Sequence, residues 1–357
     1  MKPDYSIHQA LPGFNTRDAI CNEALIIRDH YRSRGFKSDI YVDVLLPEHA
    51  NNFDLKKFSK FKPRKDDIIL YHFSVYDRIA SSIQNKNGKW ILRYHNITPA
   101  HFFFRWDYSM SGMLEGGRNL IPGLAGSCKA YIADSEFNKK ELLEHGMKNV
   151  SVLPLIFPLD EKTEEDRIWS EKLNDGKVNI IFVGRIAPNK KQEDVIKAFA
   201  WYTKFFEPEA RLILPGSFST YESGYSSNLF HLIRSLDLDD KVFLPGKINQ
   251  EELVSVYKTA DLFLSMSEHE GFCIPIVEAM KFSVPILAFS SSAVPFTLGS
   301  GGILFNEKIF PEVASMMHQM TTDKNLQKEI QAEQKKMLSN YSNENNLKQL
   351  EKILSSL

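Results

Sequence analysis

Short apolar runs alternate with longer amphipathic stretches along almost the whole chain, and this rhythm restricts the fold more than any other feature. It is typical of β-α units that build a parallel sheet. A stretch with two prolines and a charged run, residues 153–169, interrupts it and indicates a linker. We expect strands at residues 5–8, 39–44, 68–72, 90–94, 130–133 and 150–153 before this stretch. After it we expect strands at residues 177–183, 211–214, 242–244, 262–264, 284–288 and 302–305.

The two rhythmic halves predict two domains, because 357 residues exceed what one hydrophobic core usually holds. We expect an α/β protein with two doubly wound, Rossmann-like domains, residues 1–160 and 161–335, followed by helical residues 336–357. Two such sheets that face each other enclose a cleft, and open α/β sheets bind ligands at the carboxyl ends of their strands.

Local signals place some helix ends. Thr16 is a candidate N-cap for a helix that Gly35 ends, and Ser135 is a candidate N-cap for another. Asn249 and Glu252 have the spacing of a capping box.

Composition excludes some classes of protein. Lys and Arg number 44 and Asp and Glu 45, so the chain lacks the basic excess of a general nucleic-acid binder. The three cysteines have no metal-ligand spacing and no even disulfide set, which favours a reducing compartment. We find neither a signal-peptide core nor an apolar run long enough to span a bilayer, and we expect a cytoplasmic protein that is soluble or peripheral at the inner face of the membrane.

Two stretches each allow two interpretations. Residues 55–65 hold six cations with two phenylalanines between them, which suits either a solvated loop or a contact with an anionic membrane. Residues 101–110, HFFFRWDYSM, form either an acceptor-site floor or part of the core of the first domain.

The segment SEHEGFCIPIVEAM, residues 267–280, carries two carboxylates around an apolar turn. It follows an expected strand and opens a helix near Pro275. Glu270 then lies on the loop and Glu278 near the start of the helix. Backbone amides at a helix N-terminus attract anions and hydroxyl groups, and Gly271 allows close approach to the backbone. Carboxylates that accept hydrogen bonds and backbone amides that donate them suit the hydroxyl groups of a sugar. The alternative interpretation is a capped helix with a solvated glutamate.

The segment FVGRIAPNKKQEDVIKAF, residues 182–199, adds two cations to the same domain. Gly184 makes a turn after a strand, and Arg185 and Lys190 flank a proline loop. Neither a dinucleotide fingerprint nor a P-loop is present. Arg offers a planar fork to phosphate oxygens and Lys a point charge, so the pair suits a departing diphosphate. We expect Lys191 to be a solvated charge.

Together these motifs resemble the retaining glycosyltransferases of family four, the glycosyl transferases group 1, which have the two-domain GT-B fold. The resemblance rests on Gly184, Arg185 and Lys190, on the glutamate pair in EGFCIPIVE, and on AVPFTLGSGGILF. It is strong over residues 178–305 and weaker over the first half, where YHNITP and ADSEFNKKEL carry it. Phe296 stands where family members often carry Glu. The resemblance implies a first, acceptor domain, a second, nucleotide-sugar domain, and a C-terminal helix that returns to the first domain.

The resemblance also implies roles for single residues. Arg185 and Lys190 would hold the donor diphosphate, Glu278 the ribose hydroxyls, and Glu270 the transferred sugar. The amides of Gly271, Phe272 and Cys273 would lie beside that sugar, and His95 would approach it from the first domain. Lys247 and Ile248 would meet the base, and Gly13 would lie near the phosphates. The four residues expected to act in catalysis are Glu270, His95, Arg185 and Lys190.

These roles predict metal-independent transfer of a hexose with retention of configuration, with no cofactor. Asp237–Asp240 lies between a helix and a strand and is expected to be a solvated turn, so no metal site is predicted. The donor expected from family habit is GDP-mannose. The expected acceptor is a growing surface glycan, such as a lipopolysaccharide, or a lipid-linked oligosaccharide. A nucleotide-sugar epimerase and a non-catalytic sugar-nucleotide binder remain alternatives.

Overall fold

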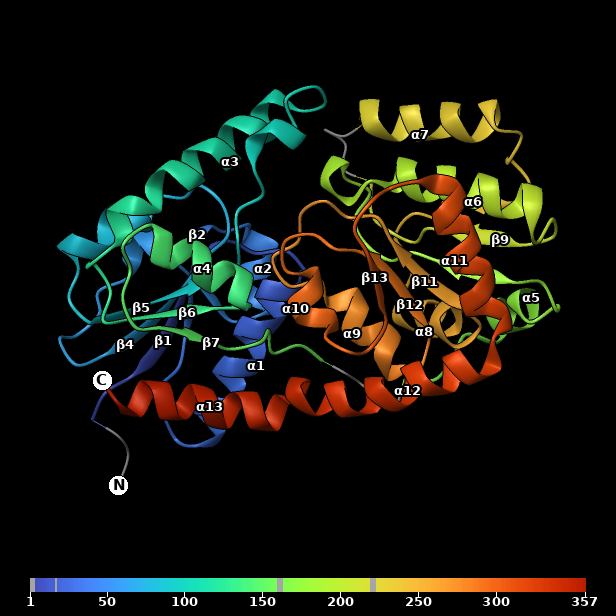
Figure 1. Cartoon of the computed structure of the whole chain (residues 1–357). Coiled ribbons are helices and arrows are strands. Elements are labelled where there is room, and N and C mark those ends of the chain that lie inside the picture. Colours follow the sequence, from blue (N-terminus) through green and yellow to red (C-terminus); the bar gives the residue numbers. More distant parts are fainter. Residues whose placement is uncertain (1–3, 17, 159–162, 219–222) are drawn as a thin grey trace. The chain divides into compact units, whose positions relative to one another are not determined.

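The computed structural model describes residues 4–16, 18–158, 163–218 and 223–357. The chain divides into two compact units (Figure 1). Unit 1 comprises Met1–His101, Ser109–Pro158 and Tyr341–Leu357, and unit 2 comprises Phe102–Tyr108 and Leu159–Asn340.

Unit 1 contains a seven-stranded sheet in the order β3-β2-β1-β4-β5-β6-β7, and the strand pairs are parallel. The strand order reverses beside β1, where β2 pairs on one side and β4 on the other. The strands are β1 (Ile7–Gly13), β2 (Ile40–Val44), β3 (Leu55–Lys57), β4 (Ile68–Phe73), β5 (Lys89–Tyr94), β6 (Ala130–Ala133) and β7 (Val150–Val152).

Helices cover both faces of this sheet (Figure 1). One core cluster joins Ile27 and Tyr31 to Leu350 and Leu354, so the first and last helices pack over the same face. The helices of unit 1 are α1 (Ala19–Ser33), α2 (Pro47–Asn52), α3 (Tyr108–Leu120), α4 (Glu136–Glu144) and α13 (Asn343–Ser355).

Unit 2 contains a six-stranded parallel sheet in the order β10-β9-β8-β11-β12-β13. The inner strands β8, β9 and β11 are fully buried, as expected for a parallel sheet with covered faces. The strands are β8 (Asn179–Ile181), β9 (Arg211–Ile213), β10 (Val242–Phe243), β11 (Leu262–Ser265), β12 (Ile286–Phe289) and β13 (Ile303–Phe305).

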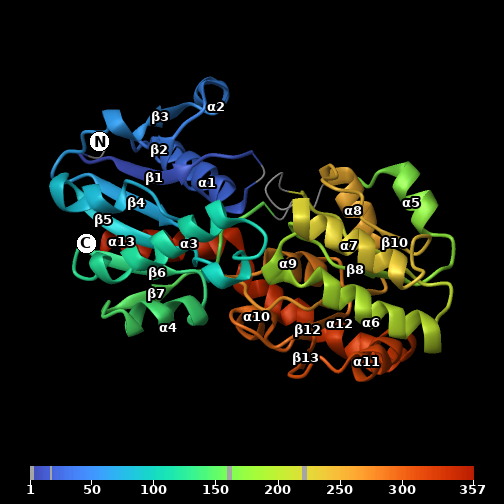
Figure 2. The ribbon, with the colours of Figure 1, turned by 90° about the horizontal axis from the view of Figure 1, so that it is seen from above.

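The helices of unit 2 follow its strands in alternation, and α6 and α7 lie side by side (Figure 2). The predicted capping box is present at the start of α8. The side chain of Asn249 accepts from the backbone amide of Glu252, and the side chain of Glu252 accepts from the backbone amide of Asn249. The helices are α5 (Arg167–Leu173), α6 (Gln192–Phe205), α7 (Ser223–Ser235), α8 (Gln250–Lys258), α9 (Ile274–Lys281), α10 (Val294–Leu298), α11 (Phe310–Thr322) and α12 (Lys324–Leu338).

The prediction of two parallel α/β sheets is confirmed, but two local predictions are wrong. Asp18, not Thr16, caps α1, because its carboxylate accepts from the amides of Ile20 and Cys21. Part of the basic stretch forms β3 rather than a loop. Of the two interpretations left open for residues 101–110, packing in the core of the first domain does not hold for Phe102–Tyr108, which belong to unit 2. In the described residues, no helix has the length and apolar character that a membrane span requires.

Candidate functional site

Three loops at the carboxyl ends of β8, β9 and β10 pack backbone against backbone. The amide of Gly184 donates to the carbonyl of Pro215 at 3.1 Å, and that of Gly216 donates to the carbonyl of Gly246 at 2.9 Å. A Cβ atom on Gly216 would lie 1.8 Å from the Gly184 carbonyl oxygen. Only glycine fits there, so Gly216 fixes the place of the loop that carries Arg185.

Lys190 and Glu270 form an ion pair between two loops of unit 2. Two further bonds tie the loops together: Asn189 donates its side-chain amide to the carbonyl of His269 at 2.9 Å, and the amide of Glu268 donates to the carbonyl of Asn189 at 2.9 Å. The Glu270 side chain is 5% exposed and that of Lys190 20%. The two sequence motifs therefore meet at one sheet edge, as the β-α pattern predicted.

The loop that carries Glu270 is also held from the other side. The hydroxyl of Ser292 accepts from the Glu270 amide at 2.7 Å, and the amide of Ala293 donates to the Glu270 carbonyl at 3.3 Å. Oε1 of Glu270 is buried and has no hydrogen-bond partner among the described residues. The site thus fixes the backbone of Glu270 and leaves one carboxylate oxygen able to accept.

Cys273 is the N-cap of α9 and has a φ of 73°, a conformation that favours glycine. Burial, and next the neighbouring Glu270 carboxylate, hold the pKa of its thiol well above the usual value. The thiol is therefore protonated near neutral pH. That the amides of Gly271, Phe272 and Cys273 lie beside a sugar stays a prediction.

Glu278 lies on α9, and one of its oxygens is held. The Tyr257 hydroxyl donates to Oε2 at 2.8 Å, and the Tyr257 ring stacks on Phe282 with centroids 5.3 Å apart. Burial raises the pKa of Glu278, and the hydrogen bond from Tyr257 opposes that rise. In the described part of the chain no residue donates to Oε1, so this oxygen can accept from a ligand hydroxyl.

The remaining predicted donor residues lie on exposed loops or in the other unit. Arg185 is exposed, and its guanidinium has no hydrogen bond or ion pair with the described residues. Lys247 is exposed and Ile248 half-buried in the loop after β10. Gly13 ends β1 in unit 1, and a Cβ there would meet nothing within 4 Å, so packing does not require glycine at this position.

Sequence reasoning missed a lysine that holds the same loop. The Lys308 ammonium lies 2.8 Å from Glu268 and 2.9 Å from Asp194 on α6. Lys191, expected to be solvated, lies 3.5 Å from Glu268 and is 25% exposed. Because Lys308 is distant in sequence from both motifs, no local pattern could have identified it.

The structure places His95 in the interior of unit 1, with its side chain 1% exposed. Its Nδ1 lies 3.0 Å from Asp134 and its Nε2 lies 2.9 Å from Nδ1 of His72. Contact with a sugar would require the ring to leave both partners, so that role of His95 stays a prediction.

A buried ion pair adjoins these histidines. Glu23 on α1 accepts from Arg93 on β5 at 2.7 Å, and Arg93 also lies 2.9 Å from Asp134. All three side chains are at most 1% exposed. An arginine inside the apolar run of β5 was the available signal for a buried partner, because arginine is rarely buried unpaired.

Glu23, His72 and His95 bring three donor atoms within 4.8 Å of one another, which raises the question of a metal. The two imidazole planes differ by 4° while their centroids lie 5.1 Å apart and their nearest nitrogens 2.9 Å apart. The rings therefore meet edge to edge, with the two nitrogens facing each other. A metal bound by both rings would need lone pairs that converge on a third point, so this geometry fits an N–H···N hydrogen bond better than a metal.

The neighbours of the two histidines indicate where the proton of that bond comes from. The side-chain nitrogen of Gln9 donates to the carbonyl of Ala24 at 2.7 Å. The side-chain oxygen of Gln9 therefore faces Nε2 of His72, at 2.9 Å. Because this oxygen can only accept, Nε2 of His72 must carry the proton and donate. Burial lowers the pKa of His95 to about 3 and raises that of Asp134 to about 7, a rise that Arg93 opposes. A protonated Asp134 satisfies every hydrogen bond in this series. Asp134 donates to Nδ1 of His95, and Nε2 of His95 then donates to Nδ1 of His72.

A comparison with known protein families finds a match for the second half of the chain. Residues 163–337 match the family Glycosyl transferases group 1. The chain therefore carries a group 1 glycosyltransferase domain, and the sequence-based recognition is confirmed.

Among relatives, mannosylfructose-phosphate synthase of Agrobacterium fabrum is 31% identical over 171 residues, 44% of this chain and 37% of that protein. O-antigen chain mannosyltransferase B of Escherichia coli is 25% identical over 124 residues, 35% of this chain and 32% of that protein. The chain spans less than two-fifths of the length of the curated relatives it matches.

Solved structures match over nearly the whole chain. Anabaena HepE, in a crystal with UDP and glucose, superposes with a TM-score of 0.76 at 15% identity, covering 99% of this chain and 100% of that one. Sucrose-phosphate synthase from Thermosynechococcus elongatus gives a TM-score of 0.73 at 14% identity, covering 98% of each chain. At these identities the matches establish the fold, which is GT-B.

Proposed function

We propose that this protein transfers a hexose from a nucleotide sugar to a glycan acceptor, with retention of configuration and without a metal. One observation carries the proposal: Arg185, the Lys190–Glu270 pair and Glu278 lie on loops or helix starts that follow strands of one parallel sheet. Ligands of open α/β sheets bind at that edge.

In the proposed mechanism, Arg185 and Lys190 stabilise the charge that develops on the departing diphosphate. Fixed cations in a partly buried site can supply this stabilisation in place of a metal. Glu270 is the counter-charge of Lys190 until the diphosphate replaces it. Oε1 of Glu270 accepts from a sugar hydroxyl, and Oε1 of Glu278 accepts from the ribose.

The proposed donor is GDP-mannose, and the proposed acceptor is a growing surface glycan or a lipid-linked oligosaccharide. Two relatives support a mannosyl group, since their names contain it. Anabaena HepE was solved with UDP and with UDP-glucose, so a uridine sugar is the donor to compare. A lipid-linked acceptor would bring the enzyme to the cytoplasmic face of a membrane.

Saturation-transfer NMR with a panel of nucleotide sugars tests the donor, and a preference for a uridine sugar would overturn GDP-mannose. Release of nucleoside diphosphate only when an acceptor is present supports transfer. Epimerised nucleotide sugar formed without acceptor would instead identify an epimerase, and binding without turnover a non-catalytic protein. We expect transfer to continue in excess EDTA; its complete loss, with recovery on adding a divalent ion, would contradict a metal-independent reaction.

A further inference from the structure

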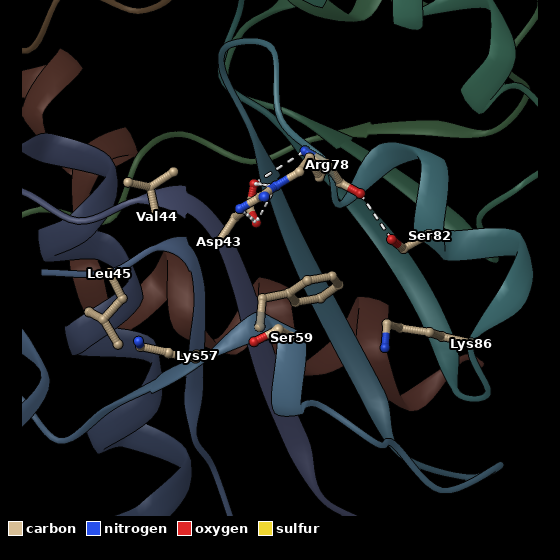
Figure 3. A pocket seen from close by; sticks show the side chains of 9 residues that line it. Asp43, Val44, Leu45, Lys57, Ser59, Arg78, Ser82 and Lys86 are labelled. Carbon is tan, nitrogen blue, oxygen red and sulfur yellow. Dashed lines mark hydrogen bonds and ion pairs between the residues drawn. The ribbon is translucent and has the colours of Figure 1, made fainter.

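Unit 1 has a hollow of about 600 Å³ at the carboxyl ends of β2 and β3 (Figure 3). The residues that supply its charges and hydroxyl groups come from these strand ends, from the turn after β3 and from the segment that follows β4. They are Asp43, Lys57, Ser59, Arg78, Ser82 and Lys86. We call this the basic hollow. It lies at the kind of sheet edge where open α/β sheets bind ligands.

The basic hollow has an excess of positive charge. Its one carboxylate, Asp43, is already paired with Arg78, at 2.8 Å. The Lys57 ammonium is exposed and has no partner among the described residues. The Lys86 ammonium donates to the carbonyl of Phe61 at 2.9 Å, which leaves its charge uncompensated. Two positive charges therefore remain for a ligand.

The hollow also offers one neutral donor, the hydroxyl of Ser59. Figure 3 shows Ser59 between the side chains of Lys57 and Lys86, with Ser82 and the Arg78–Asp43 pair along the opposite side. The Ser82 hydroxyl already donates to the carbonyl of Arg78 at 2.9 Å, so its proton is not available to a ligand. Two ammonium groups and the Ser59 hydroxyl around one space suit the oxygens of a phosphate or carboxylate.

The basic stretch of residues 55–65 is thereby explained without a membrane. Its two phenylalanines, Phe58 and Phe61, are 4% and 2% exposed and pack in the core of unit 1. They cannot enter a bilayer without unfolding, whereas Lys57 and Ser59 from the same stretch line the hollow.

We propose that the basic hollow binds the oxyanion of an acceptor sugar, so that the acceptor class is a sugar that carries a phosphate or a carboxylate. The proposal rests on the proposed function, because it assigns the second substrate of that reaction to unit 1.

The test measures binding of acceptor analogues to the full chain by titration calorimetry at fixed ionic strength. The probes are mannose 6-phosphate, galacturonate and neutral mannose. We expect one or both charged sugars to bind and mannose not to bind detectably. Which of the two binds more tightly distinguishes phosphate from carboxylate.

Lys57→Gln should weaken binding of the charged sugar about tenfold, the usual effect of losing one charge-assisted hydrogen bond, and Lys57→Glu should abolish it. Lys60→Gln is the matched control, since Lys60 is exposed in the same stretch and does not line the hollow. Equal losses for Lys57→Gln and Lys60→Gln would show diffuse attraction and overturn the proposal. Equal binding of mannose and the charged sugars, or no binding of any, would also overturn it.

Two further outcomes separate this inference from the proposed function. If charged sugars bind through Lys57 but no transfer occurs with any nucleotide sugar, the hollow stands and the proposed function fails. If transfer to an acceptor sugar that carries a phosphate or a carboxylate proceeds equally in wild type and Lys57→Glu, the function stands and the hollow fails. Cosedimentation with phosphatidylglycerol vesicles that depends equally on Lys57 and Lys60 would assign the basic stretch to a membrane and overturn the proposal.

Discussion

Replacing Lys190 by alanine should damage both the stability of unit 2 and the transfer reaction. The Glu270 side chain is 5% exposed and would lose Lys190, its only ion-pair partner among the described residues. Within the same residues, its Oε1 already has no hydrogen-bond donor. Removing one partner of a buried ion pair costs about 3–5 kcal/mol, and because Lys190 is 20% exposed we expect the lower end, about 3 kcal/mol.

Urea unfolding of Lys190→Ala and of the double variant Lys190→Ala/Glu270→Gln separates the two effects. The double variant should regain most of the lost stability, because the uncompensated charge is gone. Lys190→Ala alone should transfer sugar about 10²–10³-fold more slowly than wild type, since the diphosphate has lost a cation, and the double variant, which also lacks the Glu270 carboxylate, should be no faster. Lys177→Ala, which breaks an exposed pair with Glu209, is the control and should change neither quantity markedly.

Single-turnover rates of sugar transfer, measured beside the unfolding curves, decide the outcome. Wild-type transfer rates in Lys190→Ala would refute the role of Lys190 at the diphosphate. Unchanged stability in Lys190→Ala would refute the reasoning that the Lys190–Glu270 pair is energetically coupled to the fold.

Three other predictions concern the framework around the site. Gly216→Ala should lower the free energy of unfolding and slow transfer, because its Cβ would lie 1.8 Å from the Gly184 carbonyl oxygen; a fully stable, active variant would show that this contact is not tight. Glu23→Gln should cost about 3–5 kcal/mol in urea unfolding, because Arg93 stays buried without its main partner, and a cost below about 1 kcal/mol would contradict the buried pair. Asp134 has its pKa raised from 3.8 to about 7, so its folded form favours the protonated acid. The stability of wild type relative to Asp134→Asn, which mimics that acid, should fall from about pH 4 to about pH 7, whereas a rise over this range would contradict the assignment.

Sequence reasoning placed the loops of Lys190 and Glu270 at one sheet edge because that information is local. A parallel β-α rhythm places every loop that follows a strand at the same sheet edge, so Lys190 and Glu270 could be expected there together. Their direct pairing and the tight backbone contact at Gly216 were not predicted, since they depend on how adjacent loops pack.

The parts that sequence reasoning missed depend on contacts between distant residues. His95 turns inward because Asp134 and His72 hold both of its nitrogens, and neither neighbour is close to it in sequence. Lys308 reaches Glu268 across 40 positions. The charges of the basic stretch dominate its composition and favour a loop, whereas its first residues, Leu55–Lys57, pair with β2 as β3, and Leu55 is buried.

A crystal structure with GDP or UDP tests the central claim most directly. The predicted result is a nucleotide with its diphosphate within hydrogen-bond distance of Arg185 and Lys190 and its ribose on Glu278. A nucleotide bound far from all three residues would contradict the claim that this sheet edge holds a sugar donor.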